Sequence, residues 1–198
     1  MTIEIEPHPN LIEYFNITST FKSNLTVDDF TNCGENYNIC SNINQNIYLL
    51  KQLSELNLLK KINRVCDCGL GLGNALYDIY LQSKEIEFDF QFVGVEKQPV
   101  YIDFIKQNLS HLWGDNFRIV NFDIMEFDFS KFNIIYSYSP FNNYLQLKSM
   151  YQKIISEIKP GSIIIEHSSR GLGHFQILTE FTELEKRELE CMSVFRKI

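Results

Sequence analysis

Hydrophobic and polar positions change their period several times along the chain. Apolar residues recur at helical spacing over residues 42–59, and Ser41 or Asn42 is suited to cap such a helix. A second stretch, residues 147–158, has the clearest amphipathic pattern in the chain, and a Lys-Pro-Gly turn at residues 159–161 ends it. The sequence therefore predicts a helix in each stretch, with one apolar face packed against other elements.

Short apolar segments that are typical of buried strands alternate with helical segments through the middle of the chain. The expected strands are residues 64–67, 90–96, 117–123, 132–138 and 162–167, and the helices expected between them are residues 74–83 and 99–112. Residues 124–131 are too short and acidic a segment to predict a helix. Near the end, residues 181–189 and 192–198 favour an antiparallel hairpin. Strands that alternate with helices predict a mostly parallel sheet with right-handed crossovers.

The length of 198 residues fits one compact domain with a substantial core. The first forty or so residues are rich in Asn, Thr and Asp and have weak periodicity. We therefore expect residues 1–41 to form an irregular, partly helical cap, and residues 42–198 to form the main α/β domain.

Charge and hydropathy exclude several classes of partner. The net charge of −7 repels phosphate backbones and the basic residues form no long run, so unaided binding to nucleic acid is disfavoured. No apolar run approaches the ~20 residues of a membrane span, and residues 1–10 lack a basic-then-apolar signal pattern. We therefore expect a cytoplasmic protein with no membrane partner. The sequence leaves the oligomeric state open.

The five cysteines are odd in number and scattered, which is typical of reduced thiols in a reducing compartment. Cys66 and Cys68 would point to the same face of a strand. A zinc site needs C-x-x-C pairs or histidines at ligand spacing, and the sequence offers neither. We expect the cysteines to be packing residues and predict no metal site.

The strongest candidate for chemistry is the segment Val-Cys-Asp-Cys-Gly-Leu-Gly-Leu-Gly at residues 65–73. A strand ends near Asp67, and a G-x-G-x-G turn leads into the next helix. The glycines allow a sharp turn and a close approach of the backbone to a ligand. A dinucleotide site favours G-x-G-x-x-G, but position 74 is Asn, and Asp67 suits a ligand with an ammonium group better than one with a phosphate. A purely structural turn is the alternative.

Two further carboxylates follow later strands. Glu96 ends the strand at residues 90–96, roughly twenty residues past the glycine turn, where a carboxylate can accept both hydroxyl groups of a ribose. Asp123 ends the next strand and can accept a hydrogen bond from an adenine amino group, while the backbone N–H of Ile124 reaches a ring nitrogen. Taken singly, each carboxylate is also explained as a solvated residue at a strand end.

In this order and spacing, the segments around Asp67, Glu96 and Asp123 resemble the class I S-adenosylmethionine-dependent methyltransferases. The Lys-Pro-Gly-Ser sequence at residues 159–162 looks like the K-P-G-G turn of these enzymes, with Ser in place of the second Gly. The resemblance covers about residues 37–198. It implies an α/β fold: a Rossmann-like, open, mostly parallel seven-stranded sheet with helices on both faces and a C-terminal antiparallel hairpin.

The resemblance also implies S-adenosylmethionine as the cofactor, S-adenosylhomocysteine as the product, and no metal. It assigns the methionine part of the cofactor to Asp67 and the glycine turn, the ribose to Glu96, and the adenine to Asp123 with Ile124. The full set of implied cofactor-binding residues is Tyr37, Asp67, Cys68, Gly69, Gly71, Gly73, Glu96, Lys97, Asp123, Ile124 and Tyr138.

The fourth expected strand runs into Tyr-Ser-Pro-Phe at residues 138–141. In amine methyltransferases that act on nucleobases or glutamine side chains, Asn or Asp followed by Pro-Pro-Tyr or Pro-Pro-Phe is common at this point. Ser139 stands where an amide or carboxylate would bind the acceptor amine, and this departure argues against a nucleobase acceptor. Tyr138 and Ser139 are still expected to line the methyl-transfer site. His167, after the fifth strand, is a candidate base, with a hydrogen-bonded bystander as the alternative.

The predicted function is methyl transfer from S-adenosylmethionine to an N or O nucleophile of a small molecule or a protein side chain. Two alternatives stay open. One is a catalytically silent methyltransferase-like scaffold, which the unusual Ser139 favours. The other is an NAD-dependent oxidoreductase, against which Asn74 argues.

Overall fold

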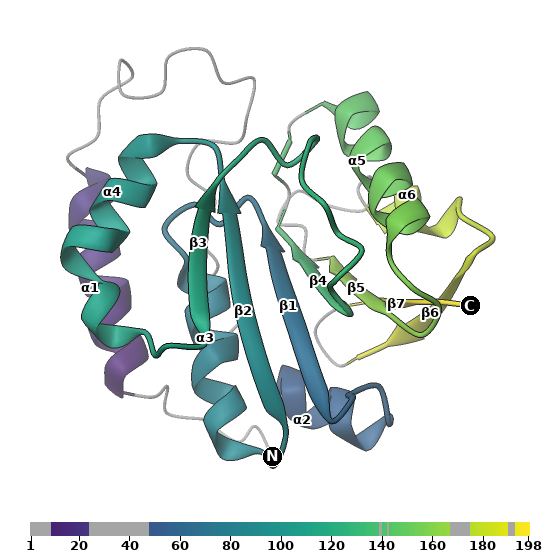
Figure 1. Cartoon of the computed structure of the whole chain (residues 1–198), viewed down its shortest axis with the longest axis horizontal. Coiled ribbons are helices and arrows are strands. Elements are labelled where there is room, and N and C mark those ends of the chain that lie inside the picture. The colour runs from purple at the N-terminus through teal and green to yellow at the C-terminus, as the bar shows by residue number, and fades with distance from the viewer. Residues whose placement is uncertain (1–8, 24–47, 139, 142, 167–174, 190–192) are drawn as a thin grey trace, which may run out of the picture.

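Seven strands form a single sheet in the order β3-β2-β1-β4-β5-β7-β6 (Figure 1). The computed structural model describes residues 9–23, 48–138, 140–141, 143–166, 175–189 and 193–198. The strands are β1 (Ile62–Cys68), β2 (Asp89–Glu96), β3 (Phe117–Asn121), β4 (Ile134–Ser137), β5 (Ile163–Glu166), β6 (Leu184–Glu188) and β7 (Ser193–Lys197). Neighbouring strands are parallel except that β7 is antiparallel to both β5 and β6. The predicted fold class, including the closing hairpin, is confirmed.

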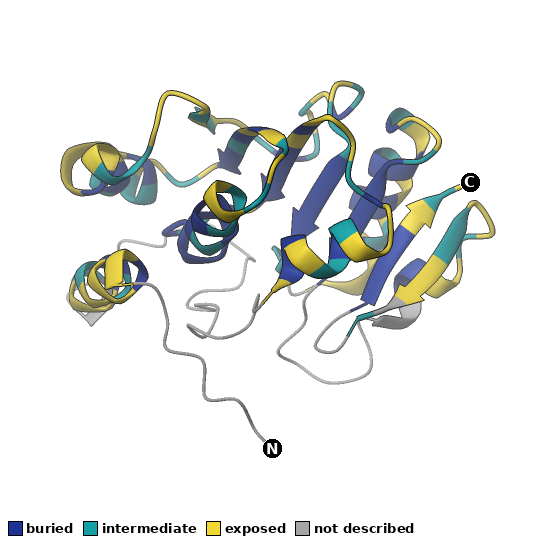
Figure 2. Cartoon of the chain, turned by 90° about the horizontal axis from the view of Figure 1, so that it is seen from below, coloured by how far each residue is buried: buried dark blue, intermediate teal, exposed yellow. Residues whose placement is uncertain are grey.

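Helices cover both faces of this sheet. They are α1 (Pro9–Ser23), α2 (Leu49–Glu55), α3 (Asn74–Gln82), α4 (Pro99–Asn108), α5 (Tyr144–Glu157) and α6 (Phe175–Thr179). Side chains alternate along β1, so Val65 packs in the cluster formed with α1 to α4, whereas Cys66 packs in the cluster formed with α5 and α6. Figure 2 shows the buried strands lying between helices whose outer sides are exposed. In the described part of the chain, no helix is both long and apolar enough to span a membrane.

Local sequence explains where several helices begin. Pro99 occupies the first turn of α4, as predicted, because its missing N–H would be unpaired there in any case. The side chain of Asn143 caps α5 by accepting hydrogen bonds from the N–H groups of Leu145 at 2.8 Å and Gln146 at 3.3 Å. The helix predicted over residues 42–59 is described only in its later part, as α2, because residues 42–47 lie outside the described residues.

The chain between β3 and β4 forms turns and no helix, as its composition predicted. Its aromatic side chains pack together instead: the ring of Phe127 lies 5.2 Å from that of Phe129 and 5.6 Å from that of Phe132, between centroids. Phe129 is fully buried, and its N–H donates to Glu157 of α5 at 2.9 Å. These rings therefore cover part of the sheet face on which α5 and α6 pack.

We expect Phe129→Ala to lower the free energy of unfolding by about 3–5 kcal/mol, because it removes a fully buried ring and leaves a cavity beneath α5. Phe122→Ala is the matched control, since its ring is 44% exposed, and we expect a change within about 0.5 kcal/mol. Urea unfolding of both variants measures the difference. Equal losses would show that the aromatic segment does not serve as a core layer.

Candidate cofactor-binding site

Asp67, Glu96 and Asp123 all lie at the carboxyl-terminal edge of the sheet, on or just after three adjacent strands. Asp67 is the penultimate residue of β1 and Glu96 is the last residue of β2. The prediction that β3 extends to residue 123 is wrong, because β3 ends at Asn121 and Asp123 lies in the turn that follows. The three carboxylates are still neighbours, since β3, β2 and β1 are adjacent in the sheet.

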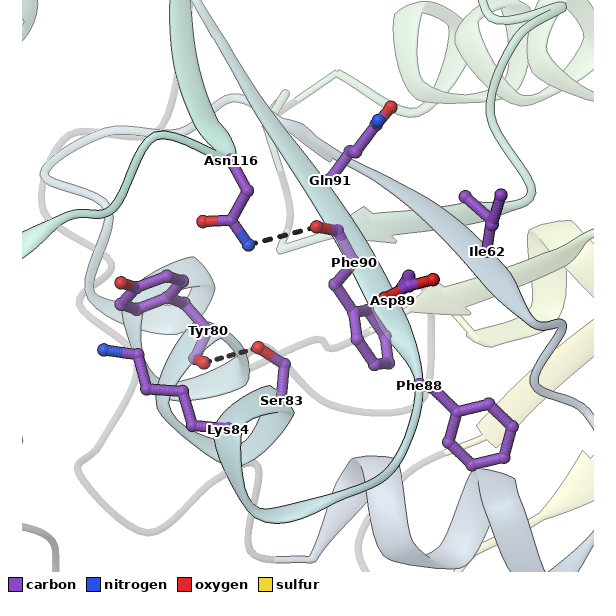
Figure 3. A pocket seen from close by; sticks show the side chains of 9 residues that line it. All are labelled: Ile62, Tyr80, Ser83, Lys84, Phe88, Asp89, Phe90, Gln91 and Asn116. Carbon is purple, nitrogen blue, oxygen red and sulfur yellow. Dashed lines mark hydrogen bonds between the residues drawn. The ribbon is translucent and has the colours of Figure 1, made fainter.

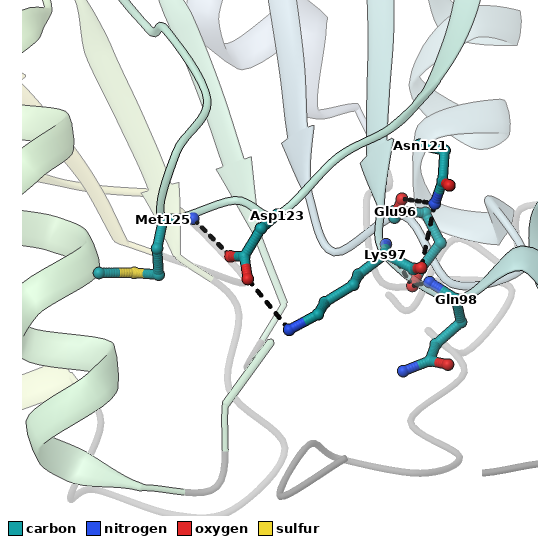
Figure 4. A network of polar contacts seen from close by, with 6 residues as sticks. All are labelled: Glu96, Lys97, Gln98, Asn121, Asp123 and Met125. Atoms are coloured by element: carbon teal, nitrogen blue, oxygen red, sulfur yellow. Dashed lines mark hydrogen bonds and ion pairs between the residues drawn. The ribbon is translucent and has the colours of Figure 1, made fainter. Parts of the chain in front are cut away.

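The carboxylate of Glu96 holds the glycine turn against the end of β2. It is 7% exposed and accepts three backbone hydrogen bonds, from Gly71 at 2.7 Å, Lys97 at 2.9 Å and Gln98 at 2.8 Å. Figure 4 shows Glu96 with Lys97 and Gln98, and the amide of Asn121 donating to the carbonyl groups of Glu96 and Lys97. The ends of β1, β2 and β3 are therefore fixed relative to one another by hydrogen bonds.

The glycine turn has the backbone geometry that its sequence predicted. Gly69, Gly71 and Gly73 have φ angles of 84°, 54° and 79°, in the left-handed region that glycine adopts without a steric penalty. The N–H groups of Gly69 and Leu70 donate to the carbonyl of Val95 on β2 at 3.1 and 2.9 Å. The turn thus crosses the end of β2 before α3 begins.

Asp67 is a buried carboxyl group in an unfavourable electrostatic environment. It is 3% exposed, and burial, with a further contribution from the negative charge of Glu96, raises its pKa to about 8. Burial disfavours the ionised form of a carboxyl group unless a cation or hydrogen-bond donors compensate it. A ligand with a positive group beside Asp67 would therefore restore its ionised form.

Asp123 has a different, more polar environment. Partial burial raises its pKa, but hydrogen bonds from the Met125 N–H and the Lys97 ammonium outweigh burial, so the net shift is downward. The Lys97 Nζ to Asp123 Oδ2 distance is 3.0 Å, and the two side chains are 56% and 32% exposed (Figure 4). Exposed ion pairs contribute only about 0–1 kcal/mol. A ligand can therefore displace Lys97 from Asp123 at little cost.

Tyr14 of α1 contacts the glycine turn from the opposite side, a feature that we did not predict. Its hydroxyl donates to the carbonyl of Leu72 at 2.8 Å, and its fully buried ring stacks on Tyr77 with 4.2 Å between centroids. A Cβ on Gly73 would lie 2.8 Å from this hydroxyl. The signal was a helical repeat of Leu11, Tyr14 and Thr18, which are all buried.

The chain after β4, where the sequence predicted the methyl-transfer site, lies against the glycine turn. A Cβ on Gly69 would lie 2.9 Å from the Cβ of Pro140. Tyr138 is half-buried and packs against the core, and Phe141 is 7% exposed. The other candidate residues for this site, Ser139 and His167, and Tyr37 in the N-terminal segment lie outside the described residues.

A buried polar row crosses the sheet edge beneath α5. Cys68, Ser137 and Glu166 occupy matching register positions on β1, β4 and β5. The Tyr151 hydroxyl of α5 lies 3.1 Å from Ser137 Oγ and donates to Glu166 Oε1 at 2.9 Å. Burial raises the pKa of Glu166 to about 7 and the pKa of Tyr151 well above its usual value. This row was missed because it depends on strand register and on a helix residue distant in sequence.

Cys66 and Cys68 are fully buried free thiols on the α5 face, as predicted for packing residues. Within the described ranges, no cluster of three or more His, Cys, Asp or Glu side chains could hold a metal ion. Cys33, Cys40 and Cys191 lie outside those ranges.

A cavity of about 480 Å³ lies at the opposite edge of the sheet, near the amino ends of β1 and β2 (Figure 3). Tyr80, Lys84, Phe90 and Asn116 are among its lining residues. Two of its polar side chains contact other lining residues: Asn116 donates to the Phe90 carbonyl at 3.0 Å, and the Lys84 ammonium lies 4.3 Å from the centre of the Tyr80 ring. This cavity is separate from the site at the carboxyl edge.

The sheet order and the glycine turn at its carboxyl edge define a protein of the Rossmann-like methyltransferase class. The model of a methyltransferase domain family matches residues 59–194, which is more than half of the chain. The chain therefore belongs to this family and is an S-adenosylmethionine-dependent methyltransferase, which confirms the resemblance and the predicted enzyme class. No curated protein sequence matches the chain.

Solved structures share this fold at low sequence identity. The S-adenosylhomocysteine-bound methyltransferase PaMTH1 of Podospora anserina is 13% identical, with 98% of this chain and 91% of that chain covered and a TM-score of 0.64. A putative RNA methyltransferase of Pyrococcus horikoshii is 17% identical, with coverage of 94% and 99% and a TM-score of 0.62. An RNA methyltransferase of Salinibacter ruber in complex with S-adenosylhomocysteine is 15% identical, with coverage of 80% and 92% and a TM-score of 0.54.

The two glycines nearest the site give a matched pair of substitutions. Gly69→Ala and Gly71→Ala each place a side chain in a left-handed conformation, which costs roughly 1–2 kcal/mol. The new Cβ at position 69 would also collide with Pro140, whereas the Cβ at position 71 would meet nothing within 4 Å. Urea unfolding should therefore show a larger loss of stability for Gly69→Ala. Equal losses would contradict the contact between the turn and the chain after β4.

The raised pKa of Asp67 predicts how stability depends on pH. The folded protein keeps this proton up to about pH 8, whereas an unfolded Asp releases it near its ordinary value of 3.8, so stability should fall as pH rises between these values. Asp67→Asn removes this dependence. At pH 8 the variant without ligand should be more stable than the unmodified protein by more than about 1.4 kcal/mol, the equivalent of one pKa unit. Urea midpoints at pH 5 and pH 8 test this, and parallel pH curves for the two proteins would refute it.

Proposed function

We propose that this methyltransferase holds S-adenosylmethionine across the carboxyl ends of β1, β2 and β3 and transfers its methyl group to an N or O nucleophile of a small molecule or a protein side chain. In this proposal Asp67 and the glycine turn hold the methionine part, Glu96 the ribose, and Asp123 with Ile124 the adenine. The observation that carries it is the 2.7 Å hydrogen bond from Gly71 to Glu96, which joins the turn after β1 to the end of β2.

The residues around the turn fit a positively charged nucleoside ligand. Burial, with a further contribution from the negative charge of Glu96, raises the pKa of Asp67 to about 8. The ammonium group of the methionine part would supply a compensating positive charge and favour the ionised carboxylate. A phosphate in the same place would face two carboxyl groups, which supports a sulfonium donor over a dinucleotide.

Bound S-adenosylmethionine supplies a methyl carbon that the neighbouring sulfonium makes electrophilic. The chain then has to align the acceptor with that carbon, and alignment of this kind contributes roughly 7–11 kcal/mol toward a barrier. We assign this alignment to Tyr138 and Ser139, next to Pro140, which lies against the glycine turn. His167, which follows Glu166 in the sequence, is proposed as the acceptor-side base.

Charge supports a small molecule or protein side chain as the acceptor in preference to RNA, although two of the structures above are described as RNA methyltransferases. The net charge is −7. Lys97, Lys148 and Lys153 are each paired with a carboxylate, on Asp123, Glu180 and Glu157. Because the charge of each of these lysines is offset by its partner, they attract an RNA backbone little, and binding would also have to overcome the negative field of the protein.

Ligand-induced stabilisation tests the cofactor site. S-Adenosylhomocysteine at 100 times its Kd should add about 2.7 kcal/mol to the free energy of unfolding, or roughly 5–10 °C in Tm, and NAD should add nothing. Glu96→Gln should lose most of this shift, because an amide cannot replace a carboxylate that accepts several N–H groups. Glu87→Gln, at an exposed position, is the control. A shift with NAD and none with S-adenosylhomocysteine would overturn the proposal.

The acceptor class is tested with radiolabelled S-adenosylmethionine in a cell extract that is then divided among nuclease, protease and ultrafiltration treatments. Once unreacted S-adenosylmethionine has been separated, and relative to extract without the protein, we expect labelled product that resists nuclease and either passes the filter or is released by protease. Label released by nuclease alone would contradict the proposed acceptor while leaving the donor site intact. Absence of label in every fraction would favour the silent scaffold.

A further inference from the structure

Asn74 is the first residue of α3 and directly follows the glycine turn. Its side chain is 7% exposed, yet both its Nδ2 and its Oδ1 atom are buried without a hydrogen-bond partner in the described part of the molecule. Leaving a buried donor or acceptor unpaired destabilises the folded state. A side chain with both groups unpaired therefore destabilises the folded protein, whereas an apolar residue of similar volume would not.

The position of Asn74 at the beginning of α3 explains why a polar side chain is placed there. The residue before Asn74 is Gly73, which provides no side-chain cap, and no acidic residue lies in the first turn of α3. The first N–H groups of the helix and the positive end of its dipole therefore receive no anion from the helix itself. Asp67, on the strand that leads into this turn, is 3% exposed and has no ion-pair partner in the described part of the molecule. The beginning of α3 thus favours an anion, and Asp67, near the end of β1, favours a cation.

An α-amino acid group carries such a pair of charges on adjacent atoms. We propose that Asn74 binds the amino-acid end of the cofactor, with Nδ2 donating to its carboxylate and Oδ1 accepting from its ammonium group. The carboxylate would also face the beginning of α3, and the ammonium would face Asp67. This assignment rests on the proposed function, and it makes Asn74 a residue that distinguishes S-adenosylmethionine and its product from nucleosides without an amino-acid group.

The test compares two ligands that differ in that group. S-Adenosylhomocysteine has the amino-acid end, whereas 5′-methylthioadenosine has the same adenosine and a sulfur but lacks it. Calorimetry measures both affinities for the unmodified protein, for Asn74→Leu, which has a similar volume and no polar atoms, and for the control Ser162→Ala. Ser162 is also fully buried with an unpaired side-chain oxygen, but it lies at the start of β5, away from the turn.

We expect Asn74→Leu to weaken binding of S-adenosylhomocysteine by about tenfold or more, as for hydrogen bonds to charged groups, and to change binding of 5′-methylthioadenosine less than about twofold. Ser162→Ala should change neither. An equal loss for both ligands would overturn the proposal, since it would indicate a distorted turn. Unchanged affinity for S-adenosylhomocysteine would overturn it as well.

A second variant decides the matter if Asn74→Leu does not fold. Asn74→Asp keeps the shape and the acceptor but replaces the donor by a negative charge, so it should weaken binding of S-adenosylhomocysteine selectively and by a larger factor. Failure of the proposed function gives a different result. In that case the unmodified protein itself would not bind S-adenosylhomocysteine.

Discussion

The candidate site depends on the hydrogen bond between the Glu96 carboxylate and the glycine turn. A sheet edge exposes backbone N–H groups that have no partner in a strand, and a buried group of this kind must be paired. The Glu96 carboxylate accepts three of them, including the 2.7 Å bond from Gly71, and so joins two segments 25 positions apart in sequence. Asp67 lies on the neighbouring strand, and burial, with a further contribution from this charge, raises its pKa to about 8. This part of the sheet edge therefore favours a cation.

The same turn is held from its other side by α1. Gly71 donates its N–H to Glu96, and the next residue, Leu72, offers its carbonyl to Tyr14 at 2.8 Å. Consecutive backbone groups are therefore fixed by a strand end and by an N-terminal helix. Because Tyr14 also stacks on Tyr77 of α3, a shift of α1 would be transmitted to the turn and to α3. The N-terminal helix therefore supports the candidate cofactor site.

The sequence alone predicted the features that depend on residues close together in the sequence. The alternating strands, the sharp glycine turn and the closing hairpin follow from local pattern and turn chemistry, and each was confirmed. The end of β3 was misplaced by two residues, since apolar Phe122 continues the strand pattern that turn formation at Asp123 interrupts. Tyr14 and the Ser137–Glu166 row escaped prediction, because their partners are brought together by helix docking and strand register.

Two buried carboxyl groups, Asp67 and Glu166, lie at the same sheet edge with raised pKa values, so a nearby positive charge favours their ionised forms. The chain as a whole carries a charge of −7, which gives it a negative electrostatic field. This field favours a sulfonium donor, whose positive charge is lost when the methyl group leaves. The neutral thioether of the product is then held by one charge fewer, while its adenosine and amino-acid contacts are unchanged. We therefore expect the negative field of the chain to favour binding of the donor over binding of the product.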